Sequence, residues 1–379
     1  MSTLLTGSDS RVGLGCYAAS GAYGAFSEDS FASLIGEAFE TGVSLFDTAD
    51  QYGDAERILG RAVEPFRDQV IVATKVGLRP DGSRDCSPDH VITSCEQSLR
   101  RMNTEYIDLY QVHFDDPGTP VADTVGALEL LQSQGKILHY GVGHLPVQRV
   151  QEYLEWGNPV SALCELSCLN YRQYTSLSRL SHSLKIVGFS PTARGLLTGS
   201  VGPESCFKDG DIRALDPAFR GARGESARRV ASHLRDLACT LDATPAQLAI
   251  RWAMEQPGVR AVLTGTTSSK HLKENLGAQQ IGWDDDIQRS IGDVLDGEER
   301  RLRKMLWEEI CSIARGDPVT GDTIVDLVYA LDSAVTFGWA KEEQVVPLFL
   351  EVWTSRRGGA DEEILEHIRK RVRELLSIT

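Results

Sequence analysis

Residues 70–77 read Val-Ile-Val-Ala-Thr-Lys-Val-Gly, an apolar run with one charge near its end. Such a run is typical of a parallel β-strand that is covered on both faces. Residues 43–49 (VSLFDTA) and 108–114 (DLYQVHF) repeat the pattern before and after it in the chain. Helical segments at residues 54–65 and 88–102 separate the three runs. This alternation of strand and helix predicts an α/β fold with parallel strands.

The same alternation extends from residue 11 to about residue 280. The five further candidate strands are residues 11–17, 137–143, 162–168, 185–191 and 261–266. Eight strand–helix units in roughly 270 residues, with no Gly-x-Gly-x-x-Gly after the first strand, favour a (β/α)₈ TIM barrel over a doubly wound sheet. Residues 199–225 are rich in Gly, Pro and charge, and we interpret them as a loop over the barrel mouth. We therefore expect a barrel domain at residues 1–284.

The last part of the chain has a different pattern. Residues 285–379 show helical periodicity and no strand-like run. The candidate helices are residues 298–314, 321–337, 341–354 and 361–377. Amphipathic helices mostly bury their apolar faces, so we expect a helical C-terminal extension that serves stability or oligomerisation. Docking of a partner through these helices remains an alternative.

Length and composition exclude several classes of protein. The 379 residues suit one large barrel with an appendage. The net charge of −15 argues against nucleic-acid and membrane partners, because it repels anionic surfaces on average. The eight cysteines show no metal-site or disulfide spacing, so we expect reduced thiols and no metal centre. No transmembrane stretch or signal peptide is visible, which favours a cytoplasmic location.

Four reactive side chains stand where predicted strands give way to loops: Asp47, Tyr52, Lys75 and His113. In a (β/α)₈ barrel the C-terminal ends of the strands meet at one mouth, where active sites lie. Together these groups would form a proton-transfer site, in which the Lys75 ammonium lowers the pKa of the Tyr52 phenol. A structural ion pair between Asp47 and Lys75 is the alternative, and the presence of His113 makes catalysis the better interpretation.

Five separated motifs extend this pattern along the chain. They are Phe46-Asp47-Thr48-Ala49 with Tyr52-Gly53, Ala73-Thr74-Lys75, Asp108-Leu109 with His113, residues 189–199 (FSPTARGLLTG) and residues 272–276 (LKENL). In this order and at these strand ends, the motifs resemble the aldo-keto reductase superfamily over most of residues 11–282. The resemblance implies an enzyme that reduces an aldehyde or ketone with a hydride from NADPH. Tyr52 would then be the general acid and His113 would orient the carbonyl, while Lys75 and Asp47 would tune the tyrosine.

The resemblance also implies positions for the ligands. The cofactor would contact Phe189, Ser190, Thr192, Arg194, Gly195, Gly265, Thr267, His271, Glu274 and Asn275. Its phosphates would lie on the loop that follows the seventh strand, and its adenosine 2′-phosphate on residues 265–275. Tyr17 and His144 would line the pocket of a small-molecule carbonyl substrate. Asp115 and Asp116 are interpreted as part of a solvated loop, with contact to a polar substrate as the alternative.

Three departures from the family pattern concern the nicotinamide nucleotide. Gly143-His144 replaces a Ser-Asn pair, and Cys164 replaces a glutamine, although a one-residue slip would place Glu165 there. Residues 265–267 (Gly-Thr-Thr) replace Gly-x-Arg, and Lys270 or His271 could supply the missing charge. An amide without its hydrogen bonds costs about 1–3 kcal/mol per group. NADH, or no nicotinamide cofactor, therefore stays open, as does a redox-neutral lyase or isomerase that uses the same four residues beside a carbonyl. A binding subunit without activity is a third alternative.

Overall fold

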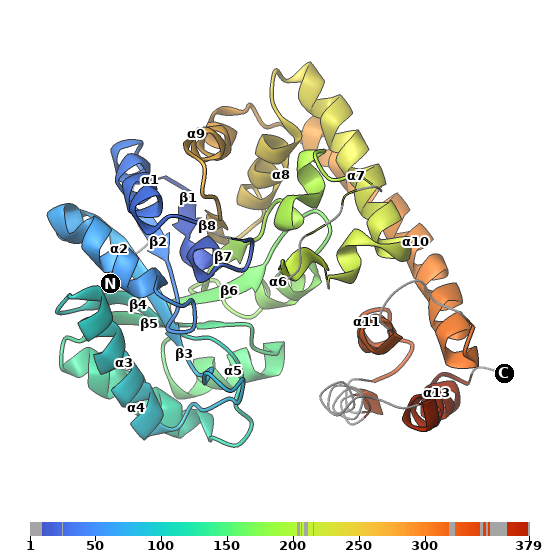
Figure 1. Ribbon diagram of the computed structural model, residues 1–379, viewed down its shortest axis with the longest axis horizontal. Helices are drawn as coiled ribbons and strands as arrows, with labels where there is room; N and C mark the ends of the chain where they lie inside the picture. The colour runs from blue at the N-terminus through green and yellow to red at the C-terminus, as the bar shows by residue number, and fades with distance from the viewer. Residues whose placement is uncertain are drawn as a thin grey trace. The chain divides into compact units, whose positions relative to one another are not determined.

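The structure is a computed structural model that describes residues 10–24, 26–202, 205, 207, 211–214, 216–317, 323–341, 344–345, 348 and 362–377. Eight parallel strands close into a barrel in the order in which they occur along the chain (Figure 1). The strands are β1 (Val12–Gly15), β2 (Leu45–Asp47), β3 (Ile71–Val76), β4 (Ile107–Val112), β5 (Ile137–Gly143), β6 (Ser161–Glu165), β7 (Lys185–Phe189) and β8 (Val259–Thr264). The predicted (β/α)₈ barrel is confirmed.

Helices surround these strands (Figure 1). They are η1 (Cys16–Ser20), α1 (Glu28–Glu40), α2 (Ala55–Val63), η2 (Glu64–Gln69), α3 (Pro88–Met102), α4 (Val121–Ser133), α5 (Val147–Trp156), α6 (Arg172–Leu177), η3 (Ala193–Thr198), α8 (Pro245–Met254), α9 (Ser269–Gly277) and η6 (Ala278–Gln280). Local sequence sets where they begin. Pro88 occupies the first turn of α3, and Thr244 and Gln247 form a reciprocal capping box at the start of α8.

Alternation along the strands decides which side chains reach the barrel mouth. Aliphatic side chains from six strands pack together inside the barrel: Leu45, Ala73, Leu109, Leu163, Val187, Ala261 and Leu263. Because successive side chains point to opposite faces of a strand, a residue two positions further on points the same way. Asp47, Lys75, Gln111, Glu165 and Phe189 are such residues, each two positions beyond a member of this inner layer. These residues at the mouth therefore form the next layer, and all of them except Phe189 are polar.

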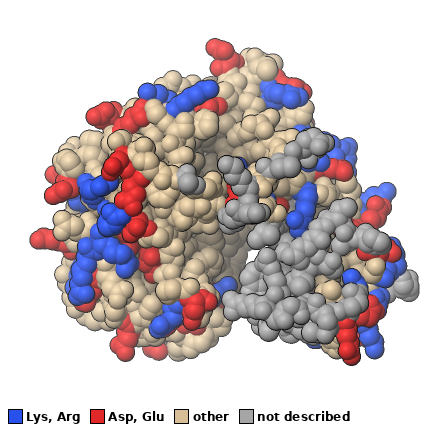
Figure 2. Space-filling view, viewed as in Figure 1, with Lys and Arg blue, Asp and Glu red and all other residues tan. Residues whose placement is uncertain are grey.

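The chain divides into two compact units. One consists of Met1–Val201 and Leu234–Asp284, and the other of Gly202–His233 and Asp285–Thr379. Acidic and basic side chains lie close together around the barrel on the face shown in Figure 2, so the two signs of charge do not separate there. Among the described helices, none combines the length and the apolar composition that a membrane crossing requires.

All the regular secondary-structure elements that the structure describes in the second unit are helices. Its elements are η4 (Ile212–Ala214), η5 (Pro217–Phe219), the first part of α7 (Gly221–Thr240), α10 (Asp285–Arg315), α11 (Thr323–Thr336) and α13 (Glu362–Leu376). A core that includes Ile310, Leu327, Leu331 and Ile368 joins α10, α11 and α13. The predicted loop at residues 199–225 is wrong at its end, because α7 already begins at Gly221. Most of the predicted helix at residues 341–354 lies outside the described residues.

Candidate active site

The barrel brings the four residues singled out in the sequence into one group. Lys75 Nζ lies 2.5 Å from Asp47 Oδ1 and donates a second hydrogen bond of 2.6 Å to the carbonyl oxygen of Thr48. The same nitrogen lies 5.0 Å from the centre of the Tyr52 ring. The Tyr52 ring centre is in turn 5.8 Å from that of His113. A carboxylate, an ammonium, a phenol and an imidazole therefore share one end of the barrel.

Sequence reasoning missed Gln111, which completes the group. Its Nε2 donates a hydrogen bond of 3.2 Å to Asp47 Oδ2, and its side chain is 1% exposed. Gln111 pairs in register with Lys75 on the neighbouring strand. Its position two residues before His113 is the signal that would have placed it on the inner face. Both oxygens of Asp47 are thus held by donors.

Burial and neighbouring charges shift the pKa values of Lys75, Asp47 and Tyr52. Burial by itself lowers the pKa of Lys75, but Asp47 and Tyr52 outweigh it, so the pKa is raised and the ammonium is kept. Burial raises the pKa of Asp47 against the opposing effects of Lys75 and Gln111. Burial also raises the pKa of Tyr52 above 10.0, although Lys75 opposes this. Lys75 thus lowers the phenol pKa as the sequence predicts, but burial has the larger effect, so the net shift is upward.

Two neutral imidazoles, those of His113 and His144, lie together at this end of the barrel. Burial, Lys75 and His144 lower the pKa of His113 to about 2. Burial, Lys75 and Arg194 lower that of His144 to about 4. The Nδ1 atom of His113 is buried and has no hydrogen-bond partner among the described residues. At neutral pH each imidazole therefore offers one N–H donor and one bare nitrogen.

Aromatic rings continue from these imidazoles around the mouth. The His144 ring centre lies 4.8 Å from those of Phe114 and Phe189 and 5.5 Å from that of His113. On the other side of Tyr52, the Tyr17 ring centre lies 4.9 Å away. The structure thus places Tyr17 and His144 next to the central group. Phe114 was missed by the sequence analysis, although it directly follows His113.

The ends of β6 and β7 form the next part of the mouth. Glu165 follows the inner-layer residue Leu163 by two positions, whereas Cys164 lies on the other face of β6 and is fully buried. Glu165 therefore faces the mouth, and Cys164 does not line it. Glu165 is paired in register with Phe189, and its Oε1 lies 3.6 Å from Arg194 Nη1.

The segment after β7 has an unusual backbone. Ser190, Ala193, Arg194 and Gly195 have φ values of 54°, 49°, 54° and 96°. Left-handed conformations cost free energy in residues with a Cβ, and they cluster where a backbone is shaped for a ligand. Successive N–H groups in such a segment can form a concave anion site, and the Arg194 guanidinium adds positive charge. Thr192 closes the turn by accepting from the N–H groups of Gly195 and Leu197 at 3.1 Å each.

The segment after β8 starts beside this loop, because Phe189 and Leu263 are register partners. Ser268 caps α9 by accepting from the N–H of His271 at 3.5 Å. Gly265, Thr267 and His271 are exposed, whereas Asn275 is buried. Exposed donors at the start of a helix of this kind suit an anion.

Comparison with known proteins identifies the family. Residues 11–294 match the model of the Aldo/keto reductase family. The chain belongs to the aldo-keto reductase family. It is 32% identical over 305 residues to probable aldo-keto reductase 1 of Glycine max, covering 76% of this chain and 88% of the relative. It is 29% identical over 314 residues to the NADH-specific methylglyoxal reductase of Escherichia coli strain K12, and the match covers 76% of this chain and 96% of that relative. The structure of glycerol dehydrogenase AKR11B4 from Gluconobacter oxydans has a TM-score of 0.70 and 27% identity, with 76% of this chain and 92% of that chain covered.

The residues at the mouth of this aldo-keto reductase fit a nicotinamide nucleotide. The strained loop and Arg194 suit a diphosphate, and the capped start of α9 suits a further anion. Glu165 can accept a hydrogen bond from a carboxamide, and the neutral His144 can donate one. Glu165 thus supplies an acceptor but no donor, unlike the expected glutamine, and His144 supplies one donor in place of the expected Ser-Asn pair.

Proposed function

We propose that this aldo-keto reductase is an NADPH-dependent carbonyl reductase in which Tyr52 is the general acid. Family membership supports a carbonyl-reducing oxidoreductase that uses a nicotinamide cofactor. The observation that carries the finer assignment is the convergence of Tyr52, Lys75 and His113 at the end of the barrel. When bound, the cofactor supplies the hydride for the carbonyl carbon.

The side chains of the site handle the proton. Reduction needs one proton at the carbonyl oxygen, and the Tyr52 hydroxyl can supply it because the phenol is protonated at neutral pH. The neutral His113 offers an N–H that can hold the same oxygen. The Lys75 ammonium stabilises the phenolate that forms when the proton leaves. Asp47, held by Gln111, keeps the ammonium in place.

We assign the cofactor to the mouth beside β7 and β8. The Phe189 ring would lie against the nicotinamide, and Ser190, Thr192, Arg194 and Gly195 would surround the diphosphate. The remaining contacts are Gly265, Thr267, His271, Glu274 and Asn275, with Lys270 beside them. The positive charge near the start of α9 favours NADPH over NADH. The NADH-specific relative makes this preference the part of the proposal that most needs a measurement.

Tyr17 and His144 are proposed to contact the small-molecule carbonyl substrate. We further propose that residues 1–284 carry the activity and that residues 285–379 serve stability or association. The reductases and the dehydrogenase among the similar proteins support this function rather than a redox-neutral reaction.

The decisive experiment is a titration of the purified protein with NADPH and with NADH, followed by quenching of nucleotide fluorescence. A dissociation constant in the micromolar range for NADPH, with weaker binding of NADH, is expected. Tyr52→Phe should abolish carbonyl reduction and leave the NADPH dissociation constant unchanged. Tyr106→Phe, which removes a hydroxyl from a ring stacked on Arg67, is the matched control and should retain activity. Absence of nucleotide binding, or reduction retained by Tyr52→Phe, would contradict the proposal.

A further inference from the structure

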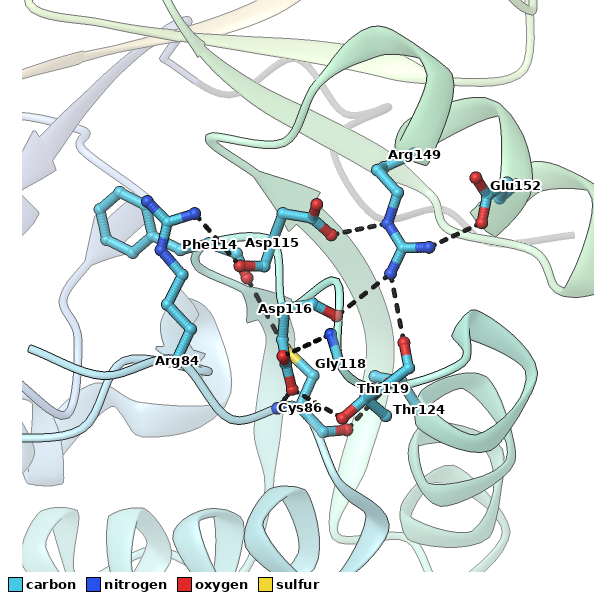
Figure 3. A network of polar contacts seen from close by, with 10 residues as sticks. All are labelled: Arg84, Cys86, Phe114, Asp115, Asp116, Gly118, Thr119, Thr124, Arg149 and Glu152. Carbon is cyan, nitrogen blue, oxygen red and sulfur yellow. Dashed lines mark hydrogen bonds and ion pairs between the residues drawn. The ribbon is translucent and has the colours of Figure 1, made fainter. Parts of the chain in front are cut away.

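A second polar group lies beside the candidate active site, in the loop that follows β4 (Figure 3). Asp115 is 7% exposed, and its Oδ1 accepts a hydrogen bond of 2.6 Å from Arg149 Nε. Arg149 also donates to Glu152 Oε2 at 2.7 Å. The sequence-based interpretation of Asp115 as part of a solvated loop is therefore wrong, because a cation on α5 draws its carboxylate inward.

Arg149 also contacts the backbone of the same loop. Its Nη2 donates to the carbonyl oxygens of Asp116 at 3.4 Å and Thr119 at 3.3 Å (Figure 3). The Asp116 carboxylate in turn accepts from the N–H of Cys86 at 2.9 Å and from the hydroxyl of Thr119 at 2.6 Å. The loop after β4 is thus tied to the loop after β3 and to α5.

The ion pair joins the two segments that carry the imidazoles of the site. Asp115 follows His113 by two residues, and Arg149 lies in the first turn of α5, which begins three residues after His144. Phe114 packs against both imidazoles, and its ring centre lies 4.5 Å from that of His113 and 4.8 Å from that of His144. The ion pair thus connects the segment that carries His113 to the segment that carries His144.

Stability alone is a weak reason for such a pair. Removing two charges from water costs about as much as their attraction returns, so a buried ion pair is often no more stabilising than apolar side chains of the same size. An ion pair does, however, fix one defined geometry. The Arg149 guanidinium donates to three acceptors in the loop after β4: the Asp115 carboxylate and the carbonyl oxygens of Asp116 and Thr119.

We propose that Asp115 and Arg149 are positioning residues that hold His113 in the orientation needed to bind the substrate carbonyl, without touching the substrate themselves. The proposal rests on the proposed function for its kinetic readout. A misplacement of about 1 Å at a catalytic group costs up to about a hundredfold in rate. Loss of the pair should therefore reduce kcat rather than nucleotide affinity.

The same strand supplies a matched control at its opposite end. Asp108 is the second residue of β4, and its carboxylate forms an ion pair of 2.7 Å with Arg67. The side chains of Arg67 and Asp108 are 15% and 10% exposed, compared with 19% and 9% for Arg149 and Asp115. Asp108→Asn and Asp115→Asn thus remove equivalent charges from equally buried pairs, and only one of them lies beside His113.

The experiment compares these two variants with wild type. Asp115→Asn should lower kcat by about tenfold or more and leave the NADPH dissociation constant within about twofold. Asp108→Asn should lower the melting temperature to a similar extent and leave kcat within about twofold. Arg149→Lys, which keeps the charge but not the planar donor set, should retain more kcat than Arg149→Met.

A readout without turnover separates this proposal from the proposed function. In protein labelled with nitrogen-15, the imidazole signals of His113, assigned with His113→Asn, should shift in Asp115→Asn and stay in place in Asp108→Asn. Equal losses of kcat in the two aspartate variants, or unmoved His113 signals in Asp115→Asn, would overturn the positioning role. If wild type reduces no carbonyl compound, the proposed function fails and the imidazole signals alone decide this inference.

Discussion

Gln111 Nε2 lies 3.2 Å from Asp47 Oδ2, the carboxylate oxygen opposite the one that contacts Lys75. This contact gives Asp47 a donor on each oxygen and holds the carboxylate plane in one orientation. Asp47 in turn holds the Lys75 ammonium next to the Tyr52 ring. Gln111 therefore influences the phenol indirectly, through Asp47 and Lys75.

Replacing Gln111 with leucine should weaken the fold and the chemistry together. The buried carboxylate loses a donor, which costs about 1–3 kcal/mol of unfolding free energy. Urea unfolding measures this loss, and steady-state kinetics should show a lower kcat. Gln132→Leu, which removes a hydrogen bond of 2.7 Å at an exposed position, is the control and should change neither quantity. Wild-type stability in Gln111→Leu would contradict the role of this contact.

Breaking the Lys75–Asp47 pair should cost more than removing both charges. Lys75→Met leaves a buried carboxylate without its cation, which destabilises by about 3–5 kcal/mol. The double variant Asp47→Leu, Lys75→Met should recover part of this loss, because no unpaired charge then remains. Urea unfolding of the two single variants and the double variant completes the cycle. Additive losses would show that the charges do not interact.

Acid should destabilise the protein through His113 and His144. Their folded-state pKa values, about 2 and about 4, lie below the ordinary 6.5, so the unfolded chain takes up protons first as the pH falls. Stability is therefore fully present above pH 6.5 and falls by about 1.4 kcal/mol per pH unit for each histidine below it. His144→Asn should remove the contribution of one histidine from this slope between pH 6.5 and about 5. The exposed His182→Asn is the control, and an unchanged slope in His144→Asn would contradict the assignment.

The phenol of Tyr52 should ionise above the ordinary tyrosine value. Its pKa is raised above 10.0 by burial against the effect of Lys75. Ultraviolet difference titration of wild type against Tyr52→Phe isolates this one group among the tyrosines. Lys75→Met should raise the value further, since it removes the opposing charge. A phenol that titrates below the ordinary value would show that Lys75 outweighs burial after all.

Arg194→Met should weaken binding of the nucleotide. The guanidinium lies in the strained loop after β7 and pairs with Glu165 at 3.6 Å. Loss of a charged contact to a diphosphate is expected to raise the NADPH dissociation constant by about tenfold, or about 1.4 kcal/mol. Arg61→Met, which breaks an exposed pair with Asp29, is the control and should bind NADPH like wild type. Unchanged affinity in Arg194→Met would place the phosphates elsewhere.

Local pattern was sufficient for much of the fold. Apolar runs such as residues 70–77 and the helical segments between them depend on neighbouring residues in the chain, so they are legible in the sequence. The same holds for Asp47, Lys75 and His113, because the rule that barrel strands share one mouth brings their ends together. The candidate helices at residues 298–314 and 361–377 were also visible as periodicity, although α10 begins earlier than predicted, at Asp285.

Contacts between segments that are distant along the chain could not be predicted from the sequence. The Gln111–Asp47 contact spans 64 positions and the Arg149–Asp115 contact spans 34, and no spacing rule links such pairs. The choice between Cys164 and Glu165 depended on which face of β6 looks into the barrel. The direction of the Tyr52 pKa shift depended on the depth of burial, which a list of neighbouring charges does not contain.

The sequence by itself determined the (β/α)₈ barrel and the set of reactive groups at its mouth, because strand and helix periods and strand ends are local properties of the chain. Only the tertiary structure decided how those groups are held: which donors reach Asp47, which face of β6 supplies Glu165, and which cation fixes the loop beside His113. The reason is physical. Register, burial and ion pairing arise between segments that meet only after the barrel has closed.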